Sequence, residues 1–227
     1  MLDENIVAVS PSTTYRMLKR AGLLNIWNRT GKSTKGTGFV QPTVPNEHWH
    51  TDIKYVNFKG TFLFLISVID GYSRYIVHHE LRMNMQEYDV QITIQRALEK
   101  FPCVKPRLIS DNGSQYISKD FSEFIKLAGL QHVKTSIAYP QANGKIERYH
   151  KTINEECLRT TSLIDLDDAR EQVVAFVNKY NTERLHSALF YLTPEDLLLG
   201  RVHEKIIERN VKLEQAKLNR FEVRNAS

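Results

Sequence analysis

Three acidic residues, Asp52, Asp111 and Glu147, are candidates for chemistry that depends on divalent cations. Hard cations such as Mg²⁺ prefer oxygen ligands, usually one or two carboxylates each, and keep water and substrate phosphate in their remaining positions. Three carboxylates can hold two such ions, and two ions about 3.5–4 Å apart stabilise both the attacking and the leaving oxygen of a phosphoryl displacement. The residue types therefore point to phosphodiester chemistry, provided that the chain brings the three together.

Glu147 lies in a stretch with the periodicity of an amphipathic helix. Its apolar residues recur three or four positions apart and are Ile146, Tyr149, Ile153 and Cys157. The polar residues that share a face with Glu147 are Asn143, His150, Lys151 and Asn154. Periodicity alone is typical of an ordinary surface helix on which Glu147 and Lys151 form a weak ion pair. The segments upstream favour a functional interpretation.

Those segments alternate between strands and helices. Short apolar runs bounded by turn residues predict strands at 53–56, 61–69, 75–81, 107–110 and 132–135, with turns at 57–60 and 70–74. Helical spacing predicts helices at 86–100, 121–128 and 169–180, the second capped by Ser118 and the third by Asp165, Asp167 and Asp168. The order of elements predicts an α/β fold with a mixed sheet.

Two of the three acidic residues lie at the ends of predicted strands. Asp52 lies early in the first strand, and Asp111 follows the C-terminal end of the fourth. In α/β sheets, residues at strand ends and in the loops beyond them form the reactive crevice. We therefore expect Asp111 to lie near Asp52 if the first and fourth strands are neighbours.

The charge of the chain is concentrated at its two ends. Residues 1–35 hold six Lys and Arg against two acidic residues, and residues 201–227 hold seven against four, whereas residues 36–200 carry a net charge of −2. Basic flanks around a nearly neutral centre suit a polyanionic partner. A merely solvated surface explains the charge equally well.

Composition excludes several classes of protein. With 227 residues and 41% hydrophobic content, the chain is long enough for a substantial core. Cys103 and Cys157 cannot form a disulfide framework or a zinc knuckle. The longest apolar run, 62–69, is too short to cross a bilayer. We expect a protein of a reducing cytoplasm, with no membrane partner.

Three local sequences resemble the signatures of DDE insertion-sequence transposases, which are relatives of retroviral integrase. They are HWHTDIKY at 48–55, SDNGSQY at 110–116 and PQANGKIER at 140–148. The 35 residues between Asp111 and Glu147 match the spacing of that family's catalytic triad. Residues 180–189, YNTERLHSAL, followed by 193–195, TPE, resemble the segment that trails the core in these transposases. The resemblance runs from about residue 47 to 199.

The resemblance implies an RNase H-like fold, a mixed five-stranded sheet flanked by helices, with a short basic helical segment before it and a helical extension after it. It implies a remnant of a helix-turn-helix DNA-binding region at 1–27, a linker at 28–46, an integrase catalytic core at 47–160 and a helical C-terminal extension at 161–227. The expected activity is cleavage of DNA at the element ends, followed by transfer of the new 3′-hydroxyl into target DNA.

The same resemblance implies the cofactors, partners and site residues. Asp52, Asp111 and Glu147 would be the catalytic residues and the ligands of Mg²⁺ or Mn²⁺, with two ions expected when DNA is bound. The expected partners are double-stranded DNA, further copies of the chain and a separately encoded helix-turn-helix subunit. The location that the resemblance implies is the bacterial cytoplasm, in association with the nucleoid. The residues expected to contact DNA are Asn143, Lys145, Lys151, Asn154, Arg184, His186, Arg16, Lys19 and Arg20.

The chain departs from the family pattern at several positions. Asn154 stands where the family commonly carries Lys or Arg, and Lys151, one turn earlier, can substitute for it. Leu185 stands where the family often has Pro. Residues 10–23 predict a basic amphipathic helix that ends at Gly22, without the preceding helices that a helix-turn-helix requires.

Two other functions fit the same sequence. A catalytically idle transposase remnant could bind DNA and regulate or accompany a complete transposase. A different nuclease could use the same fold, because a fold does not fix the reaction. Carboxylates at all three signature positions argue against decay of the catalytic site.

Overall fold

The computed structural model describes residues 9–23, 40–135 and 143–225 of the chain. Contacts divide the chain into two compact units, one formed by Gly36–Leu199 and the other by Met1–Lys35 with Gly200–Ser227. The second unit contains two described helices, α1 (Pro11–Arg20) and α8 (Val202–Asn225). All the candidate catalytic residues belong to the first unit.

The first unit is built on the predicted mixed sheet of five strands in the order β3-β2-β1-β4-β5. The strands are β1 (His48–Phe58), β2 (Thr61–Asp70), β3 (Ile76–Arg82), β4 (Arg107–Ser110) and β5 (Gln131–Lys134). β1 and β2 pair antiparallel, as do β2 and β3, whereas β1, β4 and β5 run parallel. The expected neighbourhood of the first and fourth strands is confirmed.

The first strand is longer than the sequence predicts. Every residue from Trp49 to Phe58 has a partner in β2, so the predicted strand at 53–56 extends in both directions and the predicted turn at 57–60 is wrong in its first half. Only Lys59 and Gly60 remain between the strands, and both have positive φ, 48° and 82°. A two-residue turn of this handedness matches the twist of an antiparallel hairpin.

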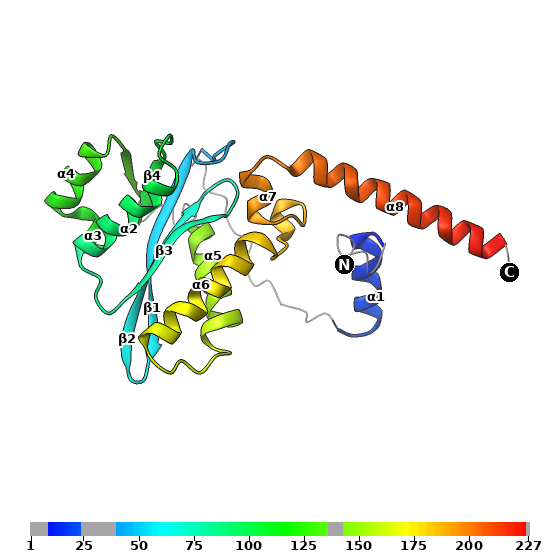
Figure 1. Cartoon of the computed structure of the whole chain (residues 1–227), viewed down its shortest axis with the longest axis horizontal. Coiled ribbons are helices and arrows are strands. Elements are labelled where there is room, and N and C mark those ends of the chain that lie inside the picture. Colours follow the sequence, from blue (N-terminus) through cyan, green and yellow to red (C-terminus); the bar gives the residue numbers. More distant parts are fainter. Residues whose placement is uncertain (1–8, 24–39, 136–142, 226–227) are drawn as a thin grey trace. The chain divides into compact units, whose positions relative to one another are not determined.

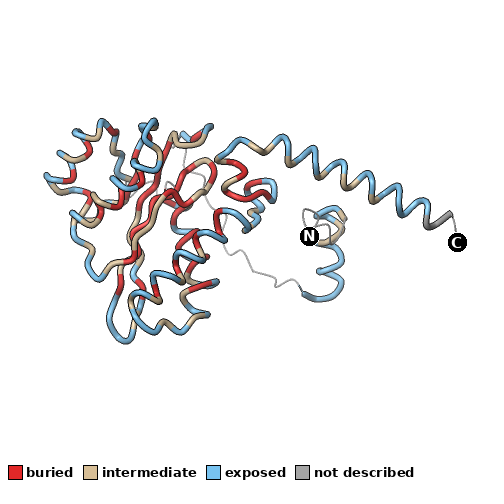
Figure 2. Tube along the Cα trace, viewed as in Figure 1, coloured by how far each residue is buried: buried red, intermediate tan, exposed pale blue. Residues whose placement is uncertain are grey.

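Helices cover both faces of the sheet (Figure 1). One face carries α2 (Glu87–Lys100), α3 (Ser114–Ile117) and α4 (Lys119–Leu127), which pack around Trp49. The other face carries α5 (Gly144–Ile153) and α6 (Leu166–Thr182). Figure 2 shows that the central strands are the most deeply buried part of this unit. Trp49 is fully buried, which agrees with a role as a core anchor.

The predicted caps and stripes position these helices. Ser118 accepts a hydrogen bond from the Phe121 backbone at the start of α4, and Asp165 caps α6 in the same way. The predicted apolar face of α5 is buried against the sheet, and its residues are Ile146, Tyr149, Ile153 and Cys157. In the other unit, α1 is capped by Ser10, and Gly22 follows it with φ of 67°.

The segment after α5 is part of the same core. A short π-helix, η2 (Asn154–Leu158), continues α5, and the buried side chains of α6 join the cluster beneath it. A 3₁₀ turn, η3 (Ser187–Leu189), and α7 (Pro194–Leu198) complete the unit. The contacts thus place residues 161–199 with the sheet. The functions expected of the segments 1–27, 28–46, 47–160 and 161–227 stay predictions. Within the described ranges, no helix is both long and apolar enough to cross a membrane.

Candidate active site

Asp52 lies near the middle of β1, on the face of the sheet that α5 covers. Side chains alternate along a strand, and Thr51 points to the opposite face, where its hydroxyl lies 3.2 Å from the Tyr116 hydroxyl. The Oδ1 atom of Asp52 accepts a hydrogen bond of 2.8 Å from the backbone of Ile53. Ser67 is the partner of Asp52 across the hairpin. The carboxylate is only partly exposed, so its surroundings are set by the fold.

Asp111 directly follows β4, the parallel neighbour of β1. The last pair in the register is His50 with Ile109, and Asp52 and Asp111 each lie two residues beyond that pair. The Oδ1 atom of Asp111 accepts a hydrogen bond of 2.9 Å from the Gly113 backbone, which starts the turn into α3. The parallel pairing of β1 with β4 therefore brings two of the predicted catalytic residues together.

Tyr116 is affected by both aspartates. Burial raises the pKa of the Tyr116 hydroxyl, and the negative charges of Asp52 and Asp111 raise it further, against the opposing effect of the hydrogen bond with Thr51. Two carboxylates can influence one buried hydroxyl only if both lie near it. This electrostatic effect supports the placement given by the strand register.

His150 connects α5 with Asp52. Its Nδ1 atom lies 3.5 Å from Oδ2 of Asp52, and the residue is only 8% exposed. Its Nε2 atom is buried and has no hydrogen-bond partner among the described residues. The sequence placed His150 on the same helix face as Glu147 but gave it no role. The signal that could have found it is its spacing of three residues from Glu147.

Glu147 is in the first turn of α5 and is exposed. It lies one turn before His150, so the helix face that carries it is the face that meets Asp52. Within the described ranges, no group of three or more His, Cys, Asp or Glu side chains is arranged to hold a metal ion. Residues 136–142, which precede α5 in the sequence, lie outside the described residues. The strand register places the two aspartates near each other, and Glu147 does not complete a metal-binding group with them among the described residues.

The start of α5 is attached to the turn after β2. Lys145 donates a hydrogen bond of 2.6 Å to the carbonyl of Gly71. Burial and the nearby charge of Arg74 lower the pKa of Lys145 to about 8, against the opposing effect of Asp70. Asn143 is buried at the same helix end. Both residues are predicted DNA contacts, and Lys145 here binds the protein backbone.

The remaining predicted contacts on the sheet unit differ in accessibility. Lys151 is half-exposed and lies 3.8 Å from Glu155. Asn154 is partly buried at the start of the π-helix η2. Arg184 makes two hydrogen bonds to Glu156, of 2.6 and 3.0 Å. These positions stay predictions, and Lys151 is the most accessible cation among them on the helix of Glu147.

The ring of His186 is packed against the protein rather than exposed for DNA contact. Its ring packs edge-on against Tyr180, with ring centroids 4.8 Å apart. Burial lowers the pKa of His186 to about 4, so the ring is neutral near pH 7. A neutral, packed imidazole can still donate a hydrogen bond to DNA, but it supplies no charge.

The predicted cations of the N-terminal segment lie on α1 and are exposed: Arg16, Lys19 and Arg20.

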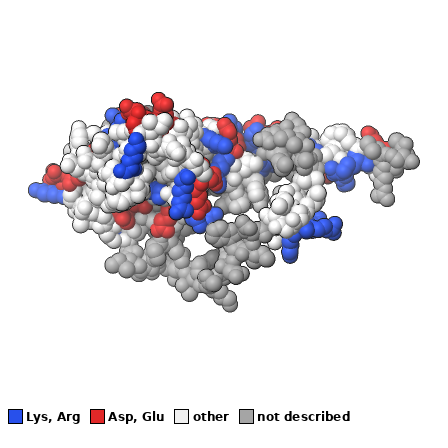
Figure 3. Space-filling model, turned by 90° about the horizontal axis from the view of Figure 1, so that it is seen from below, with Lys and Arg blue, Asp and Glu red and all other residues white. Residues whose placement is uncertain are grey.

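On the face of the molecule in Figure 3, the visible Lys and Arg side chains are interspersed with Asp and Glu. The charge is therefore mixed on that face. Any DNA contact there depends on individual cations rather than on one continuous basic surface.

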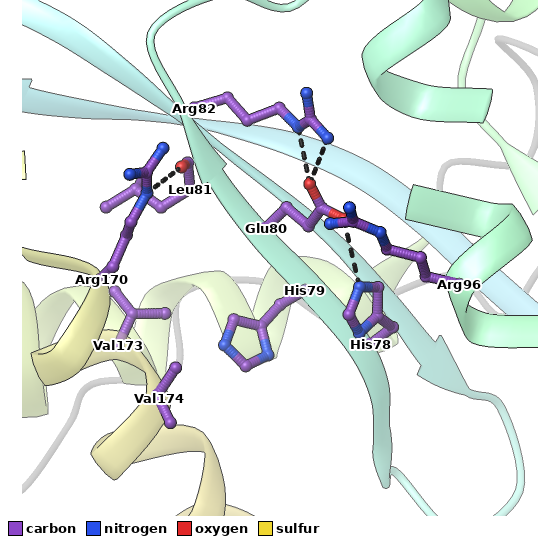
Figure 4. A pocket seen from close by; sticks show the side chains of 9 residues that line it. All are labelled: His78, His79, Glu80, Leu81, Arg82, Arg96, Arg170, Val173 and Val174. Carbon is purple, nitrogen blue, oxygen red and sulfur yellow. Dashed lines mark hydrogen bonds and ion pairs between the residues drawn. The ribbon is translucent and has the colours of Figure 1, made fainter. Parts of the chain in front are cut away.

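A separate hollow lies beside the edge strand β3 and has a volume of about 400 Å³ (Figure 4). Arg82 and Arg96 both bind Glu80 there, and His78 lies 3.3 Å from the same carboxylate. Burial raises the pKa of Glu80, but the hydrogen bonds from its neighbours lower it to about 2. None of the predicted catalytic residues lines this hollow. Its charges are paired with one another, which is typical of a structural ion-pair network.

The chemical character of the aspartate pair suits a hard cation. Asp52 in β1 and Asp111 directly after β4 offer carboxylate oxygens, and one oxygen of each is already oriented by a backbone N–H. Mg²⁺ typically takes one or two such carboxylates and completes its shell with water and phosphate. The donor set therefore fits Mg²⁺ or Mn²⁺.

The sheet order and the two aspartates define an RNase H-like fold of the integrase-core type. Residues 42–140 match a family described as integrase core domain, and residues 128–194 match a second family with the same description. The two matches together span about two thirds of the chain. A transposase for insertion sequence element IS904 from Lactococcus lactis subsp. lactis is 29% identical over 177 residues, which cover 75% of this chain and 70% of the relative.

Solved structures agree with this fold. The HTLV-2 integrase catalytic core domain, solved in complex with magnesium in a dimeric form, aligns with a TM-score of 0.54 and 19% identity over 69% of this chain and 98% of that one. A chain of the simian T-cell lymphotropic virus intasome, in complex with PP2A regulatory subunit B56 gamma, aligns with a TM-score of 0.63 and 17% identity. That alignment covers 75% of this chain and 60% of the viral chain. The chain carries an integrase core domain over residues 42–194 and is similar to insertion-sequence transposases.

Proposed function

We propose that this chain cleaves DNA at the ends of its element and transfers the resulting 3′-hydroxyl into target DNA. The observation that carries the proposal is the pairing of β1 with β4, which brings Asp52 and Asp111 together beneath α5. The contact between His150 and Asp52 turns the Glu147 face of α5 towards the same place. Membership in the integrase-core family supports this reaction class.

Asp52 and Asp111 would hold a divalent cation, and Glu147 would complete the set when DNA is bound. Bound Mg²⁺ or Mn²⁺, two ions in the expected arrangement, would stabilise the charge on the attacking and leaving oxygens. The protein contributes mainly position, since phosphodiester chemistry needs little else from it. No covalent intermediate with the enzyme is required.

The side chains around the carboxylates would hold them in place. His150 would orient the carboxylate of Asp52 from the helix side, and the contact between Thr51 and Tyr116 would fix the strand from the other face. The hydrogen bond from Lys145 to Gly71 would fix the start of α5 and therefore the position of Glu147. These contacts pre-organise the site before DNA arrives.

DNA would be held by cations near the site and by the basic helix α1. Of the predicted contacts on the sheet unit, Lys151 has a half-exposed ammonium group on the helix of Glu147, from which it would reach a phosphate. Arg184 would have to exchange Glu156 for phosphate, which costs part of the gain. The expected assembly contains several copies of the chain, because two element ends must be joined.

The test is a reaction of the full chain with its own element ends and a supercoiled target, with Mg²⁺. We expect nicked end DNA first and joined products later, and both should disappear when a chelator is added. Binding of the ends without either product, in Mg²⁺ and in Mn²⁺, would contradict the proposal and favour an idle DNA-binding remnant.

A further inference from the structure

The long helix α8 has two apolar stripes on opposite sides. One stripe is largely covered and consists of Val202, Ile206, Leu213 and Ala216, of which only Ile206 reaches 37% exposure. The other is open, with Ile207 at 48%, Val211 at 63%, Leu218 at 55% and Phe221 at 65% exposure. Figure 2 shows α8 in the colour of exposed residues along most of its length. The open stripe needs an explanation, because four large apolar side chains in a row are costly to leave in water.

The spacing of the open stripe is that of a coiled coil. The four residues occupy a and d positions of one heptad repeat: Ile207 is at d, Val211 and Leu218 are at a, and Phe221 is at d. Glu204 occupies the preceding a position and Glu214 the remaining d position. An ordinary surface helix has one broad apolar face, whereas a second narrow seam on the far side indicates a helical partner.

We propose that α8 pairs in parallel with α8 of a second copy of this chain, through the open stripe. The proposal concerns an element outside the sheet unit and does not depend on the catalytic role of Asp52, Asp111 or Glu147. The charges beside the stripe indicate that its partner is a second copy of α8.

The two borders of the stripe carry different charges. The residues at the g positions are His203, Asn210 and Lys217, and those at the e positions are Glu208, Gln215 and Glu222. All six are exposed. In a parallel pair each g residue meets the e residue five positions later in the other helix.

A parallel pair therefore places Lys217 beside Glu222 of the second copy and His203 beside Glu208. Asn210 meets Gln215, and two amides can hydrogen-bond. An antiparallel pair would set the g border against itself and the e border against itself, so that glutamates would face glutamates. The charge pattern selects a second identical helix in the parallel orientation.

Glu214 makes this pairing weak. A charged residue at a d position costs stability, although it can fix the register of a coiled coil. Within its own helix, Glu214 lies 3.6 Å from Lys217, which offsets part of its charge. With only four apolar layers, the pair should form chiefly when two chains are already held close together, for example on one DNA molecule.

Disulfide trapping tests the proposal directly in the full chain. The exposed Cys103 is first replaced by Cys103→Ser, and Leu218→Cys is then compared with its neighbour Asn219→Cys. Residue 218 faces the seam in a parallel pair and residue 219 does not. Under mild oxidation we expect Leu218→Cys to form intermolecular dimers at least about 10-fold faster than Asn219→Cys.

Charge exchange tests the orientation in the same assay. Lys217→Glu should slow trapping at residue 218 by about 10-fold, because it sets glutamates against glutamates, and adding Glu222→Lys in the same chain should restore the rate. Circular dichroism checks that each variant keeps its helix content. Equal trapping at residues 218 and 219, or no recovery in the double charge variant, would overturn the proposal. A dimer formed through another surface would not make trapping faster at residue 218 than at residue 219, because only the seam brings residue 218 of two chains together.

Discussion

At the scale of single residues, His150 is the clearest addition to the predicted triad. It links the helix of Glu147 to the strand of Asp52 through a contact of 3.5 Å. Groups that orient a ligand carboxylate commonly change metal affinity or activity 10–100-fold when they are lost. His150 is thus expected to act through Asp52 rather than on DNA.

We predict that His150→Ala lowers the cleavage rate at saturating DNA by about 10–100-fold and raises the Mg²⁺ concentration needed for half-maximal activity. DNA affinity should change little. Lys151→Ala, one residue further along the same helix, is the matched control and should weaken DNA binding while it keeps most of the rate at saturation. If His150→Ala changes only the DNA affinity, the residue contacts DNA and does not position Asp52.

At the scale of elements, the sequence predicted most of the strands and helices because their signals are local. The apolar run at 61–69, the cap at Ser118 and the stripe on α5 each depend on neighbours within a few residues, and each is confirmed. The extent of β1 was underestimated because polar residues such as His48 and His50 are buried in it. Their burial depends on strand pairing with residues far along the chain.

The same distinction applies to the candidate site. The placement of Asp111 near Asp52 could be predicted from the order of strands and is supported by the register. The role of His150 and the hydrogen bond from Lys145 to Gly71 could not, because they join residues that are about 75 to 100 positions apart and have no shared periodicity. Sequence spacing identifies the types of residue in a site, whereas their mutual contacts require the fold.

Buried histidines give the sheet unit a pH dependence. Burial lowers the pKa of His50 to about 3 and of His79, His132 and His186 to about 4. In the unfolded chain these four histidines have ordinary pKa values near 6.5. As the pH falls, they are therefore protonated in the unfolded chain before they are protonated in the folded chain. Stability is therefore full above about pH 6.5 and is lost progressively down to about pH 4.

We predict that the free energy of unfolding falls by at least about 2 kcal/mol between pH 7 and pH 5. Urea titrations at the two pH values measure it. His79→Gln should make the fall smaller, and the exposed His203→Gln is the matched control that should leave it unchanged. The same free energy at both pH values for the unsubstituted chain would show that these histidines are accessible to protons in the folded state.

At the scale of the whole molecule, the basic charge lies at the ends of the chain and the chemistry lies in the centre. Residues 1–35 and 201–227 carry net charges of +4 and +3 around a segment of −2. Such a distribution would let the flanks hold polyanionic DNA while the carboxylates of the centre stay available for cations. Each phosphate contact contributes to the salt dependence of binding through counterion release.

We predict that the triple variant Arg16→Ala, Lys19→Ala, Arg20→Ala makes the slope of log affinity against log salt shallower by about 2 to 3. The three cations are exposed on α1, and alanine preserves the helix. The uncharged change Met17→Gln on the same helix serves as control. An unaltered slope in the triple variant would assign the phosphate contacts to other parts of the chain.

The central claim is that Asp52, Asp111 and Glu147 act as one catalytic site. The most direct measurement is the single-turnover cleavage rate of pre-bound end DNA for Asp52→Asn, Asp111→Asn and Glu147→Gln, each made in the full chain. Asp167→Asn, which removes an acidic side chain that is 85% exposed on α6, is the matched control. We expect each triad variant to lose at least about 10³-fold in rate with DNA binding and folding retained, while the control stays near the unsubstituted rate. A near-normal rate in Mg²⁺ for any one of the three variants would contradict the account and remove that residue from the site.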